Sequence, residues 1–554
     1  MKREFNVTGI CVPDMHYMVV ISEKIEKIFS LVESKKYFTI NRGRQFGKTT
    51  TIGMLEKRLA GEPCRTMVGN YLCISISFEL ASKKMFADEE GFCQEFLTAI
   101  FESLEYREPE EAGKWVDNSI TDFRLLSRFI SGICRNSKRK IVLIIDEADK
   151  AANNEIFVMF LSMLREKYLL RNASKDFTFH SVILAGVYDI HNLKQKMILS
   201  GKYEPGESES RENSPWNIAA DFKVDMSFSA KEIETMLAEY ENDWHTGMDI
   251  SVIANEIRSY TSGYPYLVSR ICLLIETELD RNWTLEGVRE AVKLVLGENS
   301  TLFDDMAKRI EENGDLKNLL YNLTVGGKII NYNALDPVIK LGLMFCFVKE
   351  GSESRLVVHN KIFEIAVTDY FISRNVTSPG HRNVKDAMKS DIIRDGVFNM
   401  ELCLRKFKNN YAEIYTDKDF KFLERDGKLI FLTYLKPLIN GKGFYHFESE
   451  TRDSGKMDLV IDYLKQQFII ELKRWYGDSR HEAAYEQLAG YLKSKNTDCG
   501  YLLTFDFRRE ATAEFAESGW ITYDGKRIFD VALSVGKSPK RTRNSSRREK
   551  KNSH

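Results

Sequence analysis

The strongest constraint on this chain is a short turn, Gly47-Lys48-Thr49, that separates two different hydrophobic patterns. Before it, residues 37–41 read YFTIN, a β-branched and aromatic run that predicts a buried strand. After it, apolar residues recur at helical spacing. A strand, a tight turn and a helix start make an anion site, because backbone N–H groups at the helix start point at the ligand. The sequence therefore predicts a phosphate-binding loop in an α/β domain.

The residues of this loop have separate predicted tasks. Lys48 can reach the β- and γ-phosphates of a nucleotide, and the Thr49 hydroxyl can ligate Mg²⁺. The general pattern GxxxxGK[ST] requires Gly where this chain has Arg42, so the pattern alone is incomplete. The predicted nucleotide contacts are Arg42, Gly43, Arg44, Gln45, Phe46, Gly47, Lys48, Thr49 and Thr50.

An acidic pair about a hundred residues later strengthens this hypothesis. Residues 141–146 read IVLIID, and Glu147 follows directly. Asp146 can hold Mg²⁺ through water, while Glu147 can polarise the water that attacks the γ-phosphate. An acidic pair at a strand end is also a common helix N-cap. Together with the upstream loop, the pair favours a nucleotide site with ATP and Mg²⁺ as cofactors.

The surrounding pattern alternates strands and helices, as in a mostly parallel sheet. Strands are predicted at 37–41, 72–78, 141–146 and 181–185, and covering helices at 90–104 and 120–134. Residues 229–296 are wholly helical in pattern. Residues 302–372 give helices and then two apolar runs, LMFCFV and RLVVH, around a polar turn, which predicts a winged-helix domain.

Residues 5 to about 375 resemble the AAA-ATPase-like family of P-loop NTPases, related to archaeal and STAND-type ATPases. The resemblance lies in His16-Tyr17-Met18-Val19 and in the run from Asn41 through Thr49, which fits NRxRxxGK[ST]. It implies that an Arg at the first glycine position is a family trait. It also implies a nucleotide role for Pro265 in the sequence SGYP, which otherwise predicts only a turn before a helix. Gly186 falls where such ATPases carry a sensor residue, and no polar residue stands there.

A second constellation stands in the C-terminal part. Gly455-Lys456-Met457-Asp458 precedes an apolar run that leads into Glu471-Leu472-Lys473. Asp458 and Glu471 on neighbouring strands can point to one side, because strand side chains alternate with period two. Two carboxylates of this kind suit Mg²⁺ or Mn²⁺, and Lys473 can orient or activate water.

The same set resembles the PD-(D/E)XK nuclease superfamily. Gln487 and Tyr491, which share a helix face at i, i+4, resemble the QxxxY motif of its RecB-like branch. The resemblance implies a further metal-binding Glu on an upstream helix, for which Glu424 ranks ahead of Glu401. A Pro beside Asp458, usual in that superfamily, is not evident.

The predicted fold class is therefore α/β: a P-loop NTPase with a helical lid and a winged-helix domain, plus a PD-(D/E)XK-like α/β domain. Its expected parts are the ATPase core (1–228), lid (229–300), winged helix (301–375), linker (376–395), nuclease-like domain (396–535) and a basic disordered tail (536–554). Lys and Arg total 80 against 81 Asp and Glu, so the overall charge does not indicate nucleic acid. Nine scattered cysteines and no long apolar run lead us to expect a cytoplasmic protein with no membrane contact.

Function follows from the two constellations together. The chain is predicted to couple ATP binding, with hydrolysis, to metal-dependent cleavage of nucleic acid, with DNA ahead of RNA as partner and a homo-oligomer as one possible assembly. The alternative is a nucleotide-switched module that binds DNA or protein, with a catalytically silent nuclease-like domain. A third option, an ATP-driven remodeller, requires oligomerisation and an arginine finger that the sequence does not assign.

Overall fold

The computed structural model describes residues 2–61, 70–79, 81–82, 84–151, 154–186, 216–326, 328–376, 391–414, 420–448, 458–474, 478–506 and 518–534. The chain divides into two compact units, one made of Met1–Asp304 with Asn333–Lys349 and the other of Asp305–Tyr332 with Glu350–His554. The predicted tail at 536–554 and most of the predicted linker at 376–395 lie outside the described residues. In the described part, no helix has the length and apolar character needed to cross a bilayer.

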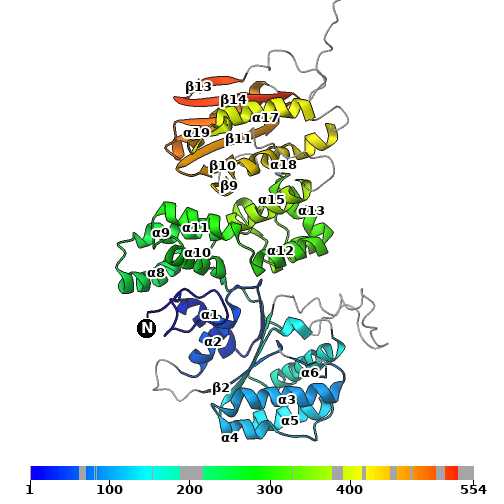
Figure 1. Ribbon diagram of the computed structural model, residues 1–554. Helices are drawn as coiled ribbons and strands as arrows, with labels where there is room; N and C mark the ends of the chain where they lie inside the picture. The colour runs from blue at the N-terminus through cyan, green and yellow to red at the C-terminus, as the bar shows by residue number, and fades with distance from the viewer. Residues whose placement is uncertain are drawn as a thin grey trace, which may run out of the picture. The chain divides into compact units, whose positions relative to one another are not determined.

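The first unit is built on a four-stranded parallel sheet (Figure 1). Its strands are β1 (Tyr37–Asn41), β2 (Tyr71–Ser77), β3 (Lys140–Asp146) and β4 (Ser181–Gly186), in the order β1-β4-β3-β2. Its helices are α1 (Ser22–Glu33), α2 (Lys48–Leu59), α3 (Glu89–Glu105), α4 (Pro109–Ala112), α5 (Phe123–Asn136) and α6 (Glu155–Asn172), with 3₁₀ turns η1 (Gly113–Trp115) and η2 (Ala148–Ala151). The four strands and the two covering helices predicted from the sequence are confirmed within a few residues.

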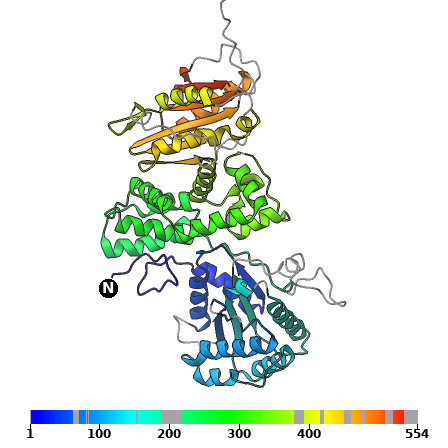
Figure 2. The ribbon, with the colours of Figure 1, turned by 45° about the vertical axis from the view of Figure 1, so that its right-hand side comes forward.

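Alternation along β2 explains how helices cover both faces of this sheet (Figures 1 and 2). Ile74 and Ile76 enter the core formed with α3, α5 and α6. Tyr71, on the opposite face, has its ring 5.8 Å from the ring of Phe29 in α1. Strands buried on both faces are typical of a parallel sheet, which explains the nearly continuous apolar sequence of β3.

A helical subdomain follows the sheet, as predicted. It contains α8 (Ala230–Trp244), α9 (Ile250–Thr261), α10 (Pro265–Thr277) and α11 (Leu285–Gly297). A capping box starts α8, because Ser229 and Glu232 each satisfy a backbone N–H of the other. The N-terminal segment packs on this subdomain through Tyr17, whose ring lies 5.1 Å from that of Tyr240.

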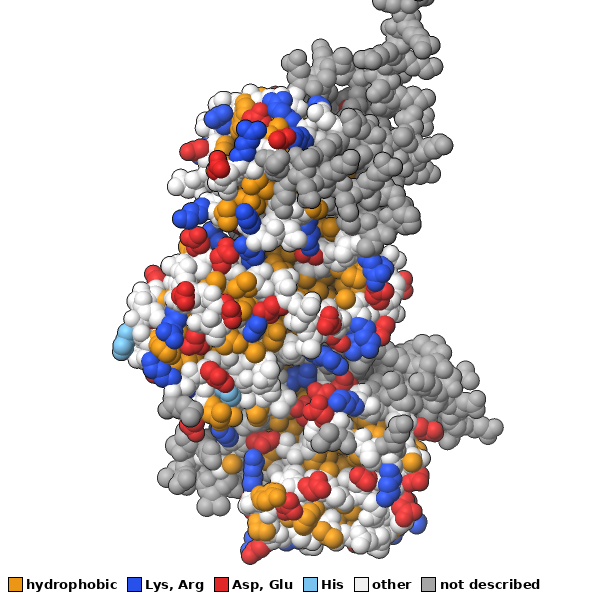
Figure 3. All heavy atoms as spheres, in the orientation of Figure 1, with side chains coloured by type: hydrophobic (Ala, Val, Ile, Leu, Met, Phe, Trp, Pro, Cys, Tyr) orange, Lys and Arg blue, Asp and Glu red, His pale blue; other side chains and the backbone are white. Residues whose placement is uncertain are grey.

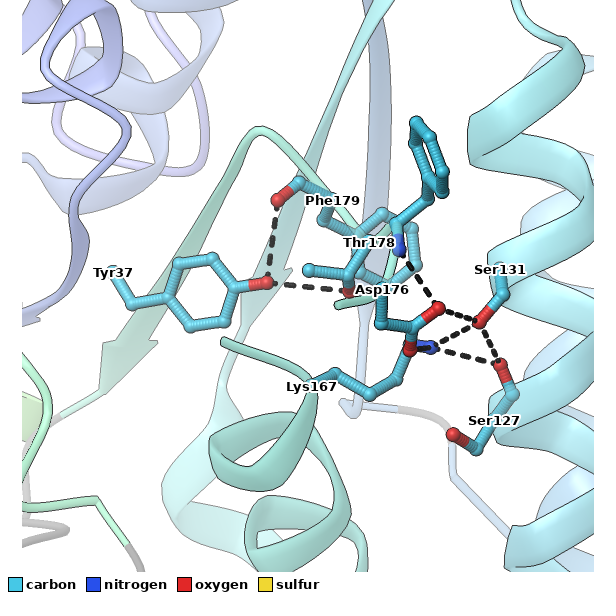
Figure 4. Close-up of polar contacts among 8 residues, drawn as sticks. Tyr37, Ser127, Ser131, Lys167, Asp176, Thr178 and Phe179 are labelled. Atoms are coloured by element: carbon cyan, nitrogen blue, oxygen red, sulfur yellow. Dashed lines mark hydrogen bonds and ion pairs between the residues drawn. The ribbon is translucent and has the colours of Figure 1, made fainter. Parts of the chain in front are cut away.

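A buried ion pair links Lys167 of α6 to Asp176 in the loop that follows, and both side chains also bind serines of α5 (Figure 4). The Lys167 ammonium is 1% exposed and donates to Asp176 Oδ2 at 2.8 Å, to Ser131 Oγ at 2.7 Å and to the Ser127 carbonyl at 2.9 Å. Burial alone would raise the pKa of Asp176, but hydrogen bonds from Lys167, Ser131 and the Phe177 N–H outweigh it and lower the pKa. Every proton of the ammonium is therefore used inside the fold.

Replacing Lys167 with methionine is expected to lower the free energy of unfolding of the first unit by roughly 3–5 kcal/mol, because Asp176 then lacks its buried cation. Chemical denaturation measures the loss, with the exposed Lys175→Met as control. The lowered pKa means that the stabilisation is present above the pKa of the unfolded carboxyl and is lost as pH falls through the folded pKa. The two proteins should thus converge in acid, and a constant difference at all pH values would contradict this account.

The second unit contains a six-stranded mixed sheet in the order β13-β14-β12-β11-β10-β9. The strands are β9 (Gly443–Glu448), β10 (Asp458–Tyr463), β11 (Gln466–Arg474), β12 (Cys499–Asp506), β13 (Gly519–Tyr523) and β14 (Lys526–Ser534); β7 (Ile393–Arg394) and β8 (Val397–Phe398) form a separate hairpin. Strands β9, β10 and β11 are antiparallel, and β12 is parallel to β11. Helix α19 (Asp478–Ser494) covers one face through Leu488 and Leu492, which contact Val460 and Leu502 in one core.

Residues 305–332 and 350–375 of the predicted winged-helix region belong to this second unit, whereas residues 333–349 belong to the first. The second unit contains α13 (Gly314–Thr324), α15 (Lys361–Val376), α17 (Met400–Ile414) and α18 (Phe420–Ile439), with η4 (Ser352–Ser354) and β6 (Leu356–Val358). Lys428 of α18 donates to the carbonyl of Thr324 at 2.6 Å, and Tyr445 of β9 donates to Asp369 of α15 at 2.7 Å. The first of these bonds joins two helices, and the second joins α15 to the sheet.

The apolar run LMFCFV of the predicted winged-helix region does not form a single element. Its first residues end helix α14 (Pro337–Met344), Cys346 has a positive φ of 57°, and β5 (Val348–Glu350) begins only at the last residue of the run. Asp336 starts the helix by accepting the N–H groups of Val338 and Ile339 at 2.8 and 3.0 Å. A short apolar run cannot by itself distinguish a strand from a buried helix end. Helix α12 (Thr301–Glu312) precedes this region as predicted.

Basic and acidic side chains are interspersed on the surface visible in Figure 3. This distribution agrees with the formal net charge of −1 for the whole chain. Any attraction to a charged ligand must therefore come from local groups rather than from a global field.

Candidate nucleotide site and candidate metal centre

The predicted phosphate loop connects the end of β1 to the start of α2. Gly47 is the N-cap of α2 and has a φ of 73°, a left-handed conformation that favours glycine. At Gly43 an added Cβ would lie 3.1 Å from the carbonyl oxygen of Phe345 and 3.3 Å from Cys346 Sγ. The chain therefore needs glycine at the two positions for different reasons. Gly47 allows a left-handed backbone conformation, and Gly43 allows Phe345 and Cys346 to pack closely against the loop.

Lys48 is the first residue of α2 and is 6% exposed. Its ammonium donates to the carbonyls of Arg42 and Gly43, at 3.1 and 3.0 Å. Burial lowers the pKa of Lys48, whereas the nearby charges of Glu147, Asp146 and Asp149 act in the opposite direction. The ammonium thus lies inside the loop, facing carboxylates from the end of β3.

Thr49 and Asp146 meet although they are far apart in sequence. Thr49 Oγ1 donates to Asp146 Oδ2 at 2.9 Å, and Asp146 is 8% exposed at the end of β3. A hydroxyl and a carboxylate are oxygen ligands of the type that Mg²⁺ prefers, and they are the pair used beside phosphates in P-loop enzymes. The donor set therefore fits Mg²⁺.

Glu147 follows Asp146 with a φ of 52°, an uncommon conformation for a non-glycine residue. Its N–H donates to Asp146 Oδ1 at 2.9 Å. Burial raises the pKa of Glu147, and the charges of Asp149 and Asp146 act in the same direction. A carboxyl with a raised pKa beside a phosphate loop is suited to accept a proton.

The side chain of Arg42 does not join this group. Its guanidinium donates to the carbonyls of Asn41 and Val224 at 2.8 and 2.9 Å and lies 5.5 Å from the ring of Phe222. Arg42 therefore ties the loop to the segment that precedes the helical subdomain. Its nucleotide contact stays a prediction, in which the backbone of Arg42 is the part that lies in the loop.

The remaining predicted loop residues have varied positions. Gln45 donates to Thr301 Oγ1 at 3.3 Å, and Thr50 Oγ1 accepts the N–H of Cys11 at 3.2 Å. Phe46 is buried. The side chain of Arg44 is exposed, whereas its backbone carbonyl accepts a hydrogen bond from the Tyr264 hydroxyl. Gln45 and Thr50 thus connect the loop to neighbouring segments.

Pro265, for which the family resemblance implies a nucleotide role, lies next to the loop. It is the first residue of α10, and its Cβ and Cγ lie 3.8 Å from the position of a Cβ added at Gly47. The preceding Tyr264 donates its hydroxyl to the carbonyl of Arg44, and its ring lies 4.8 Å from the ring of Phe46. No role for Tyr264 was predicted, because its position before Pro265 is the only signal it carries in the sequence.

Segment 333–349 is the largest part of this site that the sequence did not indicate. The N–H of Gly43 donates to Cys346 Sγ at 3.4 Å, and Lys349 donates to Ser262 Oγ at 2.8 Å. Burial lowers the pKa of Lys349, and Arg258 lowers it further. Gly43 and Cys346 are 303 residues apart in the chain, so no local sequence pattern indicates that they are in contact.

The second constellation is partly brought together in the C-terminal sheet. Glu471 and Lys473 of β11 are 0% and 7% exposed and form an ion pair with each other. Lys473 also donates to Gln487 Oε1 of α19 at 2.9 Å. Tyr491 lies one turn later on the same helix and is buried in the core beneath it. Four of the predicted residues therefore occur on one face of the sheet.

Asp458 is the first residue of β10, at the position opposite Glu448 of β9. The neighbouring pair Leu459–Ile470 places position 458 opposite position 471 if the antiparallel register continues by one step. Gly455, Lys456 and Met457 lie outside the described residues, and so do the side chains of Asp458 and Glu424. Glu401 accepts hydrogen bonds from Arg405 and Trp520 at 3.0 and 2.8 Å. In the described part, no group of three or more His, Cys, Asp or Glu is placed to hold a metal ion.

Comparisons with known proteins give one family match and several similar solved structures. A search of curated proteins finds no match. Among solved structures, the chain is similar to the Walker-type ATPase PABY2304 of Pyrococcus abyssi, with 11% identity, a TM-score of 0.45, and 66% of this chain and 99% of that one covered. It is also similar to Aeropyrum pernix ORC2 in ADPNP-ADP complexes (12%, TM-score 0.34, 67% and 98% covered) and to Drosophila ORC bound to DNA (12%, 0.31, 66% and 89%).

A sequence family gives the clearer assignment. Residues 23–291 match a family described as "AAA-like domain". This range contains the four-stranded parallel sheet, the loop around Lys48 and the acidic pair at the end of β3. The match supports an AAA-like, ATPase-type nucleotide-binding domain within residues 23–291.

Proposed function

We propose that the first unit binds and hydrolyses ATP with Mg²⁺. The observation that carries this proposal is the convergence of Lys48, Thr49 and Asp146 at the end of the sheet. Lys48 would exchange its two loop carbonyls for β- and γ-phosphate oxygens, and Thr49 with Asp146 would hold Mg²⁺. The metal neutralises charge that develops on the phosphates.

Glu147 is the proposed general base. Its raised pKa improves its ability to take a proton from water, and its place directly after Asp146 puts it near the metal-binding oxygens. Pro265 and Tyr264 hold the helical subdomain against the loop, so a change in the loop on nucleotide binding can be transmitted to that subdomain.

We further propose that the C-terminal sheet is a metal-dependent nuclease acting on nucleic acid, with DNA as first candidate. The order α18-β9-β10-β11-α19-β12 supports this proposal, and the antiparallel pairing of Leu459 with Ile470, continued by one step, would bring position 458 opposite Glu471. The buried Glu471 carboxylate fits Mg²⁺ or Mn²⁺, and Lys473, held by Gln487, is suited to orient water. ATP would gate or position the cleavage.

The test uses the purified full chain with labelled linear and circular DNA in Mg²⁺ or Mn²⁺, with and without ATP, and then RNA. Metal-dependent cleavage that ATP changes would support both activities and their coupling. Equal cleavage with and without ATP, by the wild type and by Lys48→Ala, would contradict the coupling. ATP-dependent binding without cleavage of any substrate would instead favour a nucleotide-switched recognition module.

A further inference from the structure

The carboxylate of Asp149 lies against the end of β4, although the residue belongs to η2 after β3. A Cβ added at Gly186, the last residue of β4, would come 2.6 Å from Asp149 Oδ1 and 3.1 Å from its Cβ and Cγ. Gly186 pairs with Asn41, the last residue of β1, and its carbonyl accepts the N–H of Arg42 at 3.2 Å. Asp149 therefore fills a space directly beside the start of the phosphate loop.

Two acceptor oxygens in this place are buried. Asp149 Oδ1 and Asn41 Oδ1 find no hydrogen-bond donor among the described residues. Buried acceptors are normally satisfied, so such atoms indicate a place where water or a ligand supplies the hydrogen. Both atoms lie where the carboxyl ends of parallel strands meet, the usual ligand-binding edge of an α/β sheet.

Asp149 also acts electrostatically on the groups that surround the phosphate loop. Its charge is one of three carboxylate charges that oppose the effect of burial on Lys48. After burial itself, Asp149 is the largest cause of the raised pKa of Glu147. The Asp149 carboxylate is therefore close enough to influence both the phosphate-binding cation and the proposed base.

We propose that Asp149 positions the attacking water in ATP hydrolysis. Its carboxylate accepts a hydrogen bond from one O–H of the water, while Glu147 takes the proton of the other O–H. The inference rests on the proposed ATPase function. In the step, the water oxygen bonds to the γ-phosphorus as the bond from that phosphorus to the bridging oxygen breaks, and ADP leaves with the bonding electrons. The water proton passes to Glu147, whereas Asp149 accepts a hydrogen bond and no proton.

Two substitutions test this role by independent routes in the full chain. Asp149→Asn keeps the shape of the side chain but replaces the charged carboxylate oxygen by an amide oxygen, which is a much weaker hydrogen-bond acceptor, and adds an NH₂ donor that repels the hydrogens of the water. Gly186→Ala keeps the carboxylate but displaces it, because the new Cβ occupies its place. Each is expected to lower kcat about 10- to 100-fold, since small misplacements of a reactant have effects of this size. KM and the affinity for ADP with Mg²⁺ should stay within about twofold of the wild type.

The double variant Asp149→Asn/Gly186→Ala should be no slower than the slower single variant, because both changes remove one interaction. Glu166→Gln, which removes an exposed carboxylate of α6, serves as control and should match the wild type. A wild-type kcat in Asp149→Asn would overturn the inference alone. An equal loss of ADP affinity and kcat would also overturn it, because it would show a role in binding or folding. Wild-type protein that binds ADP but never hydrolyses ATP would refute the proposed ATPase itself, and this role with it.

Discussion

Lys48→Met is expected to weaken ATP binding by roughly 100-fold or more, and to abolish hydrolysis at ordinary ATP concentrations. A hydrogen bond to a charged group contributes about 1.5–3 kcal/mol, and each 1.4 kcal/mol corresponds to a factor of ten in affinity. Lys48 supplies the cation inside the loop and faces three carboxylates, so its loss also leaves bound phosphates beside uncompensated negative charge.

Titration with ADP and with a non-hydrolysable ATP analogue, both with Mg²⁺, measures this effect. Lys57→Met is the matched control, since Lys57 lies on the same helix but is exposed. The methionine keeps most of the buried lysine stem, so the fold should survive, which thermal unfolding can verify. Equal affinities for Lys48→Met and the wild type would remove the basis for a nucleotide site at this loop.

Glu471→Gln is expected to lower metal-dependent cleavage of nucleic acid roughly 1,000-fold, while ATP binding stays unchanged. The substitution keeps the shape of a side chain that is 0% exposed but removes the charge that would hold the metal. Metal ions stabilise transition-state charge by several kcal/mol, and about 1.4 kcal/mol corresponds to a factor of ten in rate.

The measurement compares cleavage rates of labelled DNA at several Mg²⁺ and Mn²⁺ concentrations. Glu486→Gln, on the exposed side of α19, removes a carboxylate near the same site and should cleave like the wild type. Undiminished cleavage by Glu471→Gln would place the nuclease chemistry elsewhere or assign it to a contaminant. Because ATP binding is measured on the same samples, failure of this site is distinguishable from failure of the ATPase.

The parts of the fold that sequence reasoning predicted well are those whose residues carry a local signal. The strand β3 is a continuous β-branched run, and α2 begins at a glycine turn, so both were predicted within a residue or two. Strands β13 and β14 were missed, although Asp524-Gly525 between alternating residues is a hairpin signal. The information needed to predict this hairpin was therefore present in the sequence.

Other features depend on contacts between distant residues and could not be predicted in this way. Thr49 was expected to serve the same metal as Asp146, and their hydrogen bond agrees with that expectation. Nothing near Cys346 or Asp149 in sequence indicates that they lie beside Gly43 and Gly186. Those neighbours follow from the strand order β1-β4-β3-β2 and from where α14 ends, which only the folded chain determines.

Each of the two compact units is made of two separate segments of the chain, which has a practical and an evolutionary consequence. The polypeptide leaves the first unit after Asp304, returns to it at Asn333 and leaves it again after Lys349. A single proteolytic cut cannot give two complete units, and a truncation at the end of the AAA-like match would delete the segment that packs on Gly43. Recombination by one crossover would likewise split at least one of the two units, so the pair is expected to be inherited together.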